Sequence, residues 1–524
     1  MAGPYHVEAF TAEERSTLEP FVSDLEAPAF VLVNLPQVTA AALFARYSRS
    51  SKSVRRLLLD EFLATSDASR GVQSGAGQAR ASDLFGRVLA EYGDDSVAQL
   101  AGVHVACEQV SQLLAKLIEW GRLASYLEQS TRYIPFSDRR DGHYRYHRDA
   151  ELLASEHART YVTAMDGLFD AYCGMLEPLR AHLDATLPTE DDAAARRRAI
   201  RALSLDIMRG LLPAGTVSNV GVFASPQALE QLVMRLRASQ LPEAQRYAEV
   251  VNAQLQRVIP EFLTRLDRTD RGVAWVEYLR DSAAAAQRDA AALPVEPSVD
   301  TQEVRLVTWT PDAEDRVLAA SLFPDTTAPI ELLLSRVQSL GDERKRELFE
   351  DVIGVRGNRR HRPGRGLEHA EYTFEIVSDY GAFRDLQRHR LLTIQWQRLT
   401  PALGYSVPGE VEDAGLGAGW RQAVALAEAA HDAVAGAFPE QAGYLVTLAH
   451  RIRYVVKLNA REAMHLIELR SSPQGHPSYR RIAREMHRQI DEVAGHHNIA
   501  GAMRFVGAAD VHLPRYAAEA AGPV

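Results

Sequence analysis

The chain has 524 residues, too many for one hydrophobic core, and this length suits two or three domains. Its formal net charge of −10 disfavours broad nucleic-acid binding, although a local basic pocket is compatible with it. Its two cysteines, Cys107 and Cys173, exclude a disulfide framework and a cysteine-rich zinc site. The N-terminus lacks a signal-like pattern, and no apolar run approaches the roughly 20 residues that a bilayer requires. We therefore expect a cytoplasmic protein with no membrane partner.

In the first half of the chain, residues 29–36 alternate like a strand and precede a helical pattern over residues 38–47. A second strand is expected from residue 97 onward, and Val110 to Ile118 have helical spacing. Ser225 followed by Pro226 predicts a helix start, with serine as the cap and proline in the first turn.

Residues 282–298 are rich in small residues and proline, which is typical of a connector. We therefore divide the chain into a first domain at residues 1–281, a linker at 282–301 and a second domain at 302–524. The second domain opens with an alternating segment at residues 304–311, followed by a helical pattern at 313–322.

Two further elements are expected in the second domain. Tyr372, Phe374 and Ile376 alternate as in a half-buried strand, which leads into a short helix ending near Leu392. Asn459, three residues before Glu462, predicts another helix start.

One motif occurs twice, beginning at Arg388 and at Trp120, 268 positions apart (388 − 120). The later copy begins with Arg-His-Arg, but its following residues no longer match the motif. The earlier copy has a degraded opening but continues with Ser125, Glu128, Ser130, Arg132 and Tyr133. Each copy keeps what the other has lost, which indicates an internal duplication whose copies divided one site.

The retained residues suit recognition of a phosphorylated ligand. Arginine grips phosphate with a planar fork of donors, as Arg388 and Arg390 could do. Arg461 and His465 share a helix face with Asn459, and Glu128, Ser130 and Arg132 would share one side of an extended segment. The alternative interpretation of each group is a solvated polar surface. Because the two copies retain complementary residues, a ligand-binding site is favoured.

These motifs resemble the signature of flavin-dependent thymidylate synthases, RHR-x-x-S-x-N-E-x-S-x-R-Y, and the similarity spans most of both halves. The resemblance implies an α+β fold with two tandem domains of this type, related by a pseudo-two-fold axis. It also implies FAD as cofactor, with NADPH and methylenetetrahydrofolate as co-substrates, in the conversion of dUMP to dTMP. Because the family forms homotetramers of single-copy chains, two duplicated chains should form a homodimer.

The resemblance assigns roles residue by residue. The second half would supply the flavin ligands Arg388, His389, Arg390, Asn459, Arg461 and His465 (an Asn in the family), and the catalytic Arg470 that polarises the pyrimidine ring. The first half would hold the nucleotide through Glu128, Gln129, Ser130, Arg132 and Arg209, with Glu128 also near the flavin, Ser130 also catalytic, and Arg388 and Arg470 also contacting substrate. The degraded counterparts are Trp120, Gly121 and Arg122 in the first half and Trp396, Gln397, Arg398, Thr400 and Gly443 in the second.

One departure concerns the substrate. The family often has Gln at a nucleotide-contacting position where this chain has Asp385, and a carboxylate would repel phosphate unless it binds base or ribose. The alternatives are therefore flavin-dependent modification of a different pyrimidine nucleotide, or a non-catalytic flavin- and nucleotide-binding protein. No metal and no nucleic-acid partner are expected, and neither cysteine is needed for the family's chemistry.

Overall fold

The computed structural model describes residues 8–47, 50–63, 99–188, 192–293 and 302–507. These residues form two compact units. The first draws on Met1–Glu108, Leu123–Glu128 and Asn219–Pro294, and the second on Gln109–Arg122, Gln129–Ser218 and Val295–Val524. The units therefore differ from the domains at 1–281 and 302–524, since most of residues 129–218 belongs to the second unit. The domain boundary, its linker and the pseudo-two-fold relation stay predictions.

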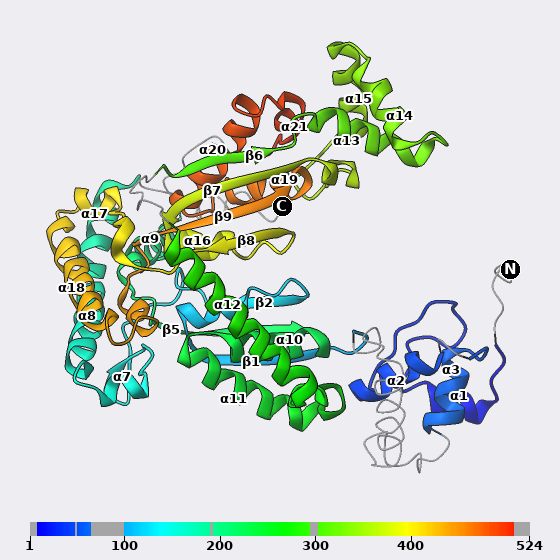
Figure 1. Ribbon diagram of the computed structural model, residues 1–524, viewed down its shortest axis with the longest axis horizontal. Coiled ribbons are helices and arrows are strands. Elements are labelled where there is room, and N and C mark those ends of the chain that lie inside the picture. The colour runs from blue at the N-terminus through cyan, green and yellow to red at the C-terminus, as the bar shows by residue number, and fades with distance from the viewer. Residues whose placement is uncertain (1–7, 48–49, 64–98, 189–191, 294–301, 508–524) are drawn as a thin grey trace. The chain divides into compact units, whose positions relative to one another are not determined.

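The first unit contains a sheet of strand order β1-β5-β2, formed by β1 (Val103–Ser111), β5 (Val217–Ala224) and β2 (Ala124–Glu128). Helices α10 (Pro226–Ala238) and α11 (Pro242–Val258) pack together and lie along one side of this sheet (Figure 1). The side chain of Ser225 caps α10, with Pro226 in its first turn, which confirms the expected helix start.

The remaining elements of the first unit are mostly short. Residues 38–47 are helical as expected, but residues 29–36 form only a single bridge, between Val22 and Leu32. Residues 282–292 of the predicted linker are helical, because they complete α12. The elements are α1 (Ala12–Leu18), α2 (Gln37–Tyr47), α3 (Val54–Leu57), η1 (Leu58–Leu63), η3 (Pro260–Leu263), η4 (Thr269–Val273) and α12 (Ala274–Ala292).

The second unit is built on an antiparallel sheet of strand order β6-β7-β9-β8. Its strands are β6 (Val304–Trp309), β7 (Glu371–Asp379), β8 (Leu392–Trp396) and β9 (Arg451–Asn459). Tyr372, Phe374 and Ile376 are buried on one face, which confirms the expected strand. Helices α19 (Ala460–Arg470) and α20 (Pro477–Glu492) pack together beside the sheet, and α20 contacts β6 and β7 (Figure 1). Mixed helix and antiparallel sheet confirm the α+β class.

The helix before the Arg388-His389-Arg390 triplet is shorter than expected. Helix α16 spans Tyr380–Leu386 and does not reach Leu392. Leu392 instead begins β8, whose side chains are alternately buried and exposed and which pairs with β9. The triplet therefore lies in the turn between α16 and β8, and not at a helix end, because the alternating pattern over residues 392–396 favours a strand.

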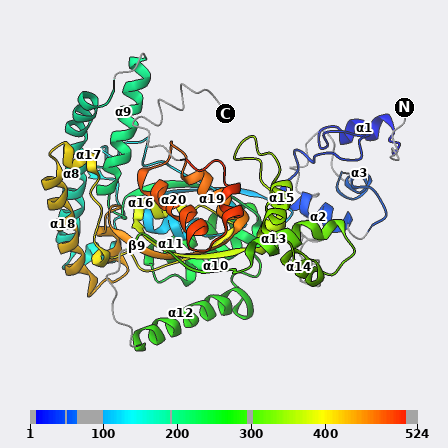
Figure 2. The same cartoon turned by 90° about the horizontal axis from the view of Figure 1, so that it is seen from above.

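Residues 150–188 and 192–208 are largely helical and belong to the second unit. Helix α8 (Ala158–Thr186) packs against α9 (Ala193–Met208) and α18 (Gly417–Ala435), and Figure 2 shows the three side by side. Helix α9 runs directly into the 3-10 helix η2 (Arg209–Leu211), and this continuity sets the position of Arg209. Smaller elements nearby are α6 (Gln112–Ile118), β3 (Arg139–Arg140), β4 (His143–Tyr144), α7 (Ala150–Ala154), η7 (Pro401–Leu403), α17 (Gly409–Asp413) and η8 (Gln441–Leu445).

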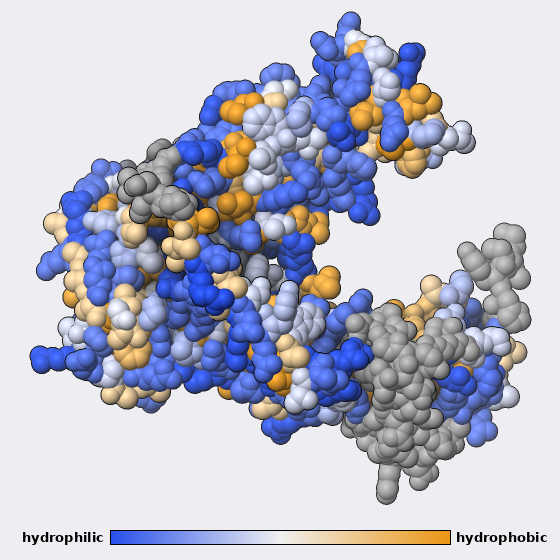
Figure 3. All heavy atoms as spheres, viewed as in Figure 1, coloured by the Kyte–Doolittle hydropathy of each residue, from blue (hydrophilic) through white to orange (hydrophobic). Residues whose placement is uncertain are grey.

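A helical segment between β6 and β7 begins with α13 (Ala313–Leu322), at the bounds expected from the sequence. It continues through η5 (Phe323–Asp325), α14 (Ile330–Gln338), α15 (Asp342–Ile353) and η6 (Arg365–His369), and α21 (His497–Ala502) contacts α15. Apolar side chains gather at the surface around α14, where Leu332 is exposed (Figure 3). No helix within the described residues is both long and apolar enough to cross a membrane.

Candidate active site

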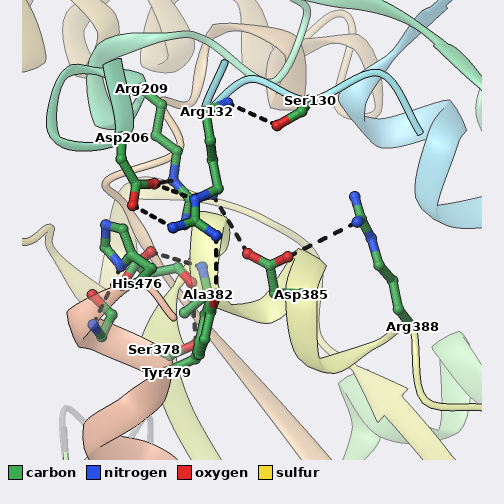
Figure 4. A network of polar contacts seen from close by, with 12 residues as sticks. Ser130, Arg132, Asp206, Arg209, Ser378, Ala382, Asp385, Arg388, His476 and Tyr479 are labelled. Atoms are coloured by element: carbon green, nitrogen blue, oxygen red, sulfur yellow. Dashed lines mark hydrogen bonds and ion pairs between the residues drawn. The ribbon is translucent and has the colours of Figure 1, made fainter. Parts of the chain in front are cut away.

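The half-buried Arg132 and the buried Asp206 form an ion pair in the second unit (Figure 4). The Nε and Nη2 groups of Arg132 donate to the two carboxylate oxygens of Asp206, each over 2.9 Å. The same guanidinium donates to the hydroxyl of Tyr479 over 3.3 Å and to the carbonyl of Gln474 over 3.1 Å. Two-pronged arginine–carboxylate contacts fix orientation as well as charge. The Arg132 fork is therefore held in one direction by α9 and α20.

Asp385 joins the two motif-bearing halves of the chain. One of its oxygens lies 3.5 Å from Nη1 of Arg209 and the other 4.0 Å from Nη1 of Arg388 (Figure 4). Arg209 comes from the first half and Arg388 from the second, so one buried carboxylate on α16 lies between arginines from both. The half-sites that the sequence assigns to different halves thus meet within one compact unit.

The charge of this cluster is positive. Burial raises the pKa of Asp385, but the surrounding guanidinium groups outweigh it and hold that pKa far below its ordinary value. The pKa of Asp206 is likewise lowered: burial raises it, and His476, Arg209 and Arg132 together outweigh burial. The four arginines that act on Asp385 are Arg132, Arg209, Arg388 and Arg470. Four cations against the three carboxylates of Asp206, Asp379 and Asp385 leave an excess of one positive charge, which suits an anionic ligand.

A second polar chain starts at Arg470, the last residue of α19. Its Nε–H donates to Nε2 of His389 over 3.0 Å, so the proton of His389 resides on Nδ1, which donates to Glu462 over 2.8 Å. The other oxygen of Glu462 lies 3.4 Å from Nδ1 of His465. Burial lowers the pKa of His389 to about 4. Burial would raise the pKa of Glu462, but its histidine partners lower it to about 2. His389 is therefore neutral and Glu462 ionised near neutral pH.

The ligand atoms of His389, Glu462 and His465 lie within 4.8 Å of one another and could hold a metal ion. Two imidazoles and a carboxylate suit a divalent transition metal. However, the hydrogen bond from cationic Arg470 places a positive charge beside His389. The described contacts also satisfy the three groups without an ion, so we read the cluster as a hydrogen-bonded chain that orients Arg470.

The start of α19 matches the expectation for Asn459, whose side-chain oxygen accepts from the backbone N–H of Glu462 over 2.9 Å. Arg461 donates to the carbonyl of Pro363 over 2.9 Å and to Glu368 over 3.2 Å. His465 is half-buried one turn further along. Arg461 is thus tied to the preceding loop, whereas His465 lies beside Glu462.

The nucleotide strand is shorter than expected. β2 ends at Glu128, and Ser130 and Arg132 lie in a turn in which Ser130 Oγ accepts from the backbone N–H of Arg132 over 3.2 Å. The expectation that Glu128, Ser130 and Arg132 alternate along one extended face is therefore wrong, because the serine side chain closes a turn. Glu128 belongs to the first unit, whereas the carbonyl of Gln129 accepts from Ser218 over 3.2 Å within the second.

The degraded motif positions also meet in the second unit. Trp120 and Trp396 stand where the functional copies have Arg388 and Glu128, and their rings contact edge to face with centroids 5.4 Å apart. Arg122 donates to Thr393 over 2.9 Å. An aromatic pair offers no charge to a phosphate, so these positions favour packing over ligand binding.

Sequence reasoning missed three residues of the cluster: Asp206, His476 and Tyr479. Asp206 precedes Arg209 by three positions on a helix, a spacing that places them on one face and could have been noticed. His476 lies before Pro477, a helix-start pattern, and its ring accepts from the N–H of Ser478 over 3.2 Å. Tyr479 carries no local signal, since only tertiary folding brings it to Arg132.

A cavity of about 320 Å³, including its open mouth, adjoins this cluster. Asp206, Arg209, Asp379, His476 and Trp420 are among its lining residues. Within the described residues Nη2 of Arg209 is buried without a hydrogen-bond partner, although Arg209 lines this space. A buried guanidinium with an unused donor favours an acceptor group in the cavity.

The sequence profile of the thymidylate synthase complementing protein family matches residues 35–261 and 305–495, well over half of the chain. All predicted site residues fall within these two segments. A protein of Chlamydia muridarum named UPF0159 protein is 38% identical over 97% of both chains, and its namesake from Chlamydia pneumoniae is 35% identical over 97% of both. A UPF0159 protein of Thermoplasma acidophilum is 31% identical over 92% of this chain and 98% of its own. The chain belongs to the thymidylate synthase complementing protein family, as the two motif copies predicted.

Among solved structures, thymidylate synthase X of Helicobacter pylori with FAD and dUMP matches 39% of this chain and 100% of its own, with 17% identity and a TM-score of 0.30. A second structure of the same enzyme, complexed with FAD and dUMP, matches 38% of this chain and 97% of its own, with 19% identity and a TM-score of 0.29.

Proposed function

We propose that the protein is an FAD-dependent enzyme that reductively methylates a pyrimidine deoxynucleotide, most simply dUMP to dTMP, with methylenetetrahydrofolate and NADPH as co-substrates. The observation that carries this proposal is the cluster around Asp385, where arginines of both halves of the chain converge and outnumber the nearby carboxylates. Family membership supports the same reaction.

The residues present fit a flavin dinucleotide. Arg388 and Arg390 are exposed, and the 11-residue α19 begins at its Asn459 cap with Arg461 in its first turn. Arginine forks and helix N-termini both favour a pyrophosphate. FAD, when bound and reduced, supplies the hydride that the reaction requires.

The chain's own residues have separate tasks in this proposal. Arg132 and Arg209 bind the nucleotide's anionic end from orientations set by Asp206 and Asp385. Arg470 stabilises negative charge that develops on the pyrimidine ring, while neutral His389 holds its Nε. No hydrogen bond to the two Nη groups of Arg470 occurs within the described residues, so both can face the substrate.

Asp385 favours one alternative, a different pyrimidine nucleotide. An ionised carboxylate accepts hydrogen bonds and repels phosphate, so it suits a sugar hydroxyl or a base N–H. The test is to measure thermal protection by a panel of pyrimidine nucleotides, since a ligand at 100 times its Kd adds about 2.7 kcal/mol. Product analysis with the protecting nucleotide and both co-substrates follows. A methylated product supports the proposal; a protein that cannot be loaded with FAD contradicts it.

FAD titration into Arg388→Ala and Arg122→Ala tests the division of roles. Arg388→Ala should lose charge-assisted contacts worth about 1.5–3 kcal/mol, whereas Arg122→Ala should bind FAD normally. Arg122 is the matched control because it is the arginine kept at the start of the degraded copy, at the position that corresponds to Arg390, and it contacts Thr393 instead. Equal losses in both variants would contradict the assignment of flavin binding to the second half.

A further inference from the structure

Two arginine-rich segments of the second unit differ in what their guanidinium groups contact. On α20 each arginine has a partner or is buried: Arg481 pairs with Glu303, Arg488 pairs with Glu485 and Glu492, Arg484 donates to the carbonyl of Gly507, and Arg480 is 3% exposed. In residues 357–364, here called the arginine loop, Arg359, Arg360 and Arg362 form no ion pair with any described residue, and Arg360 and Arg362 are exposed. The loop therefore concentrates uncompensated positive charge on a protein of net charge −10.

The arginine loop is held in one conformation from within. Just before it, the buried Arg356 donates to both oxygens of Glu468, over 2.7 and 2.6 Å, and to the carbonyl of His361 over 2.7 Å. The ring of His361 accepts from the N–H of Gly357 over 3.2 Å, and the side chain of Asn358 accepts from the N–H of Arg360 over 2.9 Å. A loop whose backbone is fixed by a buried ion pair has little backbone entropy left to lose on binding.

The loop also adjoins the candidate flavin residues. Its Pro363 carbonyl accepts from Arg461, and Arg461 further pairs with Glu368, which Arg365 also contacts. Glu368 thus contacts both Arg365 and Arg461. Through Arg461, α19 is connected to the arginine loop. A ligand that reached the flavin residues of α19 would lie within reach of these guanidinium groups.

We propose that the arginine loop binds the phosphate groups of a small phosphorylated co-substrate, and that this ligand is a nicotinamide dinucleotide bearing an additional phosphate on its adenosine ribose. Three adjacent forks of donors suit two or more phosphates, and arginine is the preferred residue for such groups. The identity of the dinucleotide rests on the proposed function, which needs a hydride donor beside the flavin. Recognition of phosphate by the loop is independent of the proposed function.

The test compares a loop variant, Arg359→Ala/Arg360→Ala/Arg362→Ala, with a control of equal charge change, Arg344→Ala/Arg346→Ala/Arg488→Ala. The control arginines are about as exposed but are paired with glutamates on α15 and α20. Calorimetric titration uses 2′,5′-ADP and 5′-AMP on the FAD-loaded full chain. We expect the loop variant to bind 2′,5′-ADP about tenfold or more weakly and the control to match the wild type. Flavin reduction by NADPH should slow in the loop variant, and reduction by NADH should change less.

Equal 2′,5′-ADP affinities in the loop variant, the control and the wild type would overturn the proposal. So would tighter, loop-dependent binding of a single-stranded oligonucleotide at the same ionic strength, which would identify a nucleic-acid surface. If no nucleotide is methylated but 2′,5′-ADP binding still depends on the loop, the proposed function fails while the loop's phosphate recognition stands. Circular dichroism should be unchanged in the loop variant, because Arg359, Arg360 and Arg362 hold no structural ion pair.

Discussion

Arg470 donates its Nε–H to Nε2 of His389 over 3.0 Å, and this contact links the end of α19 to the turn that carries the Arg-His-Arg triplet. It requires a neutral imidazole protonated on Nδ1, which the ionised Glu462 supports from the other side. An arginine anchored through Nε keeps its two Nη groups in a fixed plane. A preorganised fork of this kind stabilises developing negative charge without having to reorganise.

The first prediction concerns Arg470. Arg470→Ala should lower single-turnover methylation by about 10²–10³-fold, while the Kd for the nucleotide changes less. Arg470→Lys should recover little activity, because an ammonium cannot donate to His389 and to substrate with the same geometry. Full activity in Arg470→Ala would end the assignment of this residue to catalysis.

The second prediction concerns the Arg132–Asp206 pair. Asp206→Asn removes the counter-charge of the half-buried Arg132 and of the buried Arg209, and breaking a buried pair costs about 3–5 kcal/mol of unfolding free energy. Urea unfolding measures the loss. As a control, Glu492→Gln removes the carboxylate of a solvent-exposed pair with Arg488 and should leave the unfolding midpoint nearly unchanged. Equal midpoints for both variants would contradict a structural role for Asp206.

The third prediction is a loss of stability in acid. The folded pKa values of His389, about 4, and Glu462, about 2, both lie below their unfolded values, which are about 6.5 and 4.3. A lowered folded pKa means that the unfolded chain binds the proton first. Stability is therefore full above about pH 6.5, falls towards pH 4 through His389, and falls further towards pH 2 through Glu462.

His389→Gln should flatten the upper part of this fall, by at most about 1.4 kcal/mol per pH unit, in urea unfolding between pH 6.5 and 4. His497 gives a contrast of opposite sign. Its hydrogen bond to Asp491 raises its pKa, so its contribution is present at low pH and is lost as the pH rises. A wild-type profile that is flat from pH 7 to 4 would contradict the buried neutral state of His389.

The sequence predicted the elements with strong local patterns. Asn459 and Ser225 cap helices as expected, and Tyr372, Phe374 and Ile376 form the buried side of β7, because capping and alternation act within a few residues. The end of α16 was misplaced, since residues 387–396 can continue a helix or begin a strand, and pairing of β8 with β9 decides between them.

The composition of the candidate site was only partly predictable. The motif copies supplied Arg132 and Arg388, and the family resemblance added Arg209 and Arg470, but neither gave the residues that orient them. Asp206 and Tyr479 reach Arg132 from α9 and α20 through long-range packing, which no local pattern encodes. The turn at Ser130 was missed because a serine side chain can satisfy a backbone N–H in place of a strand partner.

The last prediction decides whether a site forms within one chain. Arg132 donates to the hydroxyl of Tyr479, and the guanidinium of Arg470 lies 5.6 Å from the centre of the same ring, so the two arginines meet in one compact unit of one chain. Mixed Arg132→Ala and Arg470→Ala chains should therefore stay inactive, because every site would contain one of the two defects.

Hybrid formation must be shown independently, by co-expressing the variants with two different affinity tags and purifying through both. If sites formed between chains, a hybrid dimer would contain one wholly wild-type site and activity would return. Recovered turnover in doubly purified hybrids would thus place Arg132 and Arg470 of each functional site on different chains.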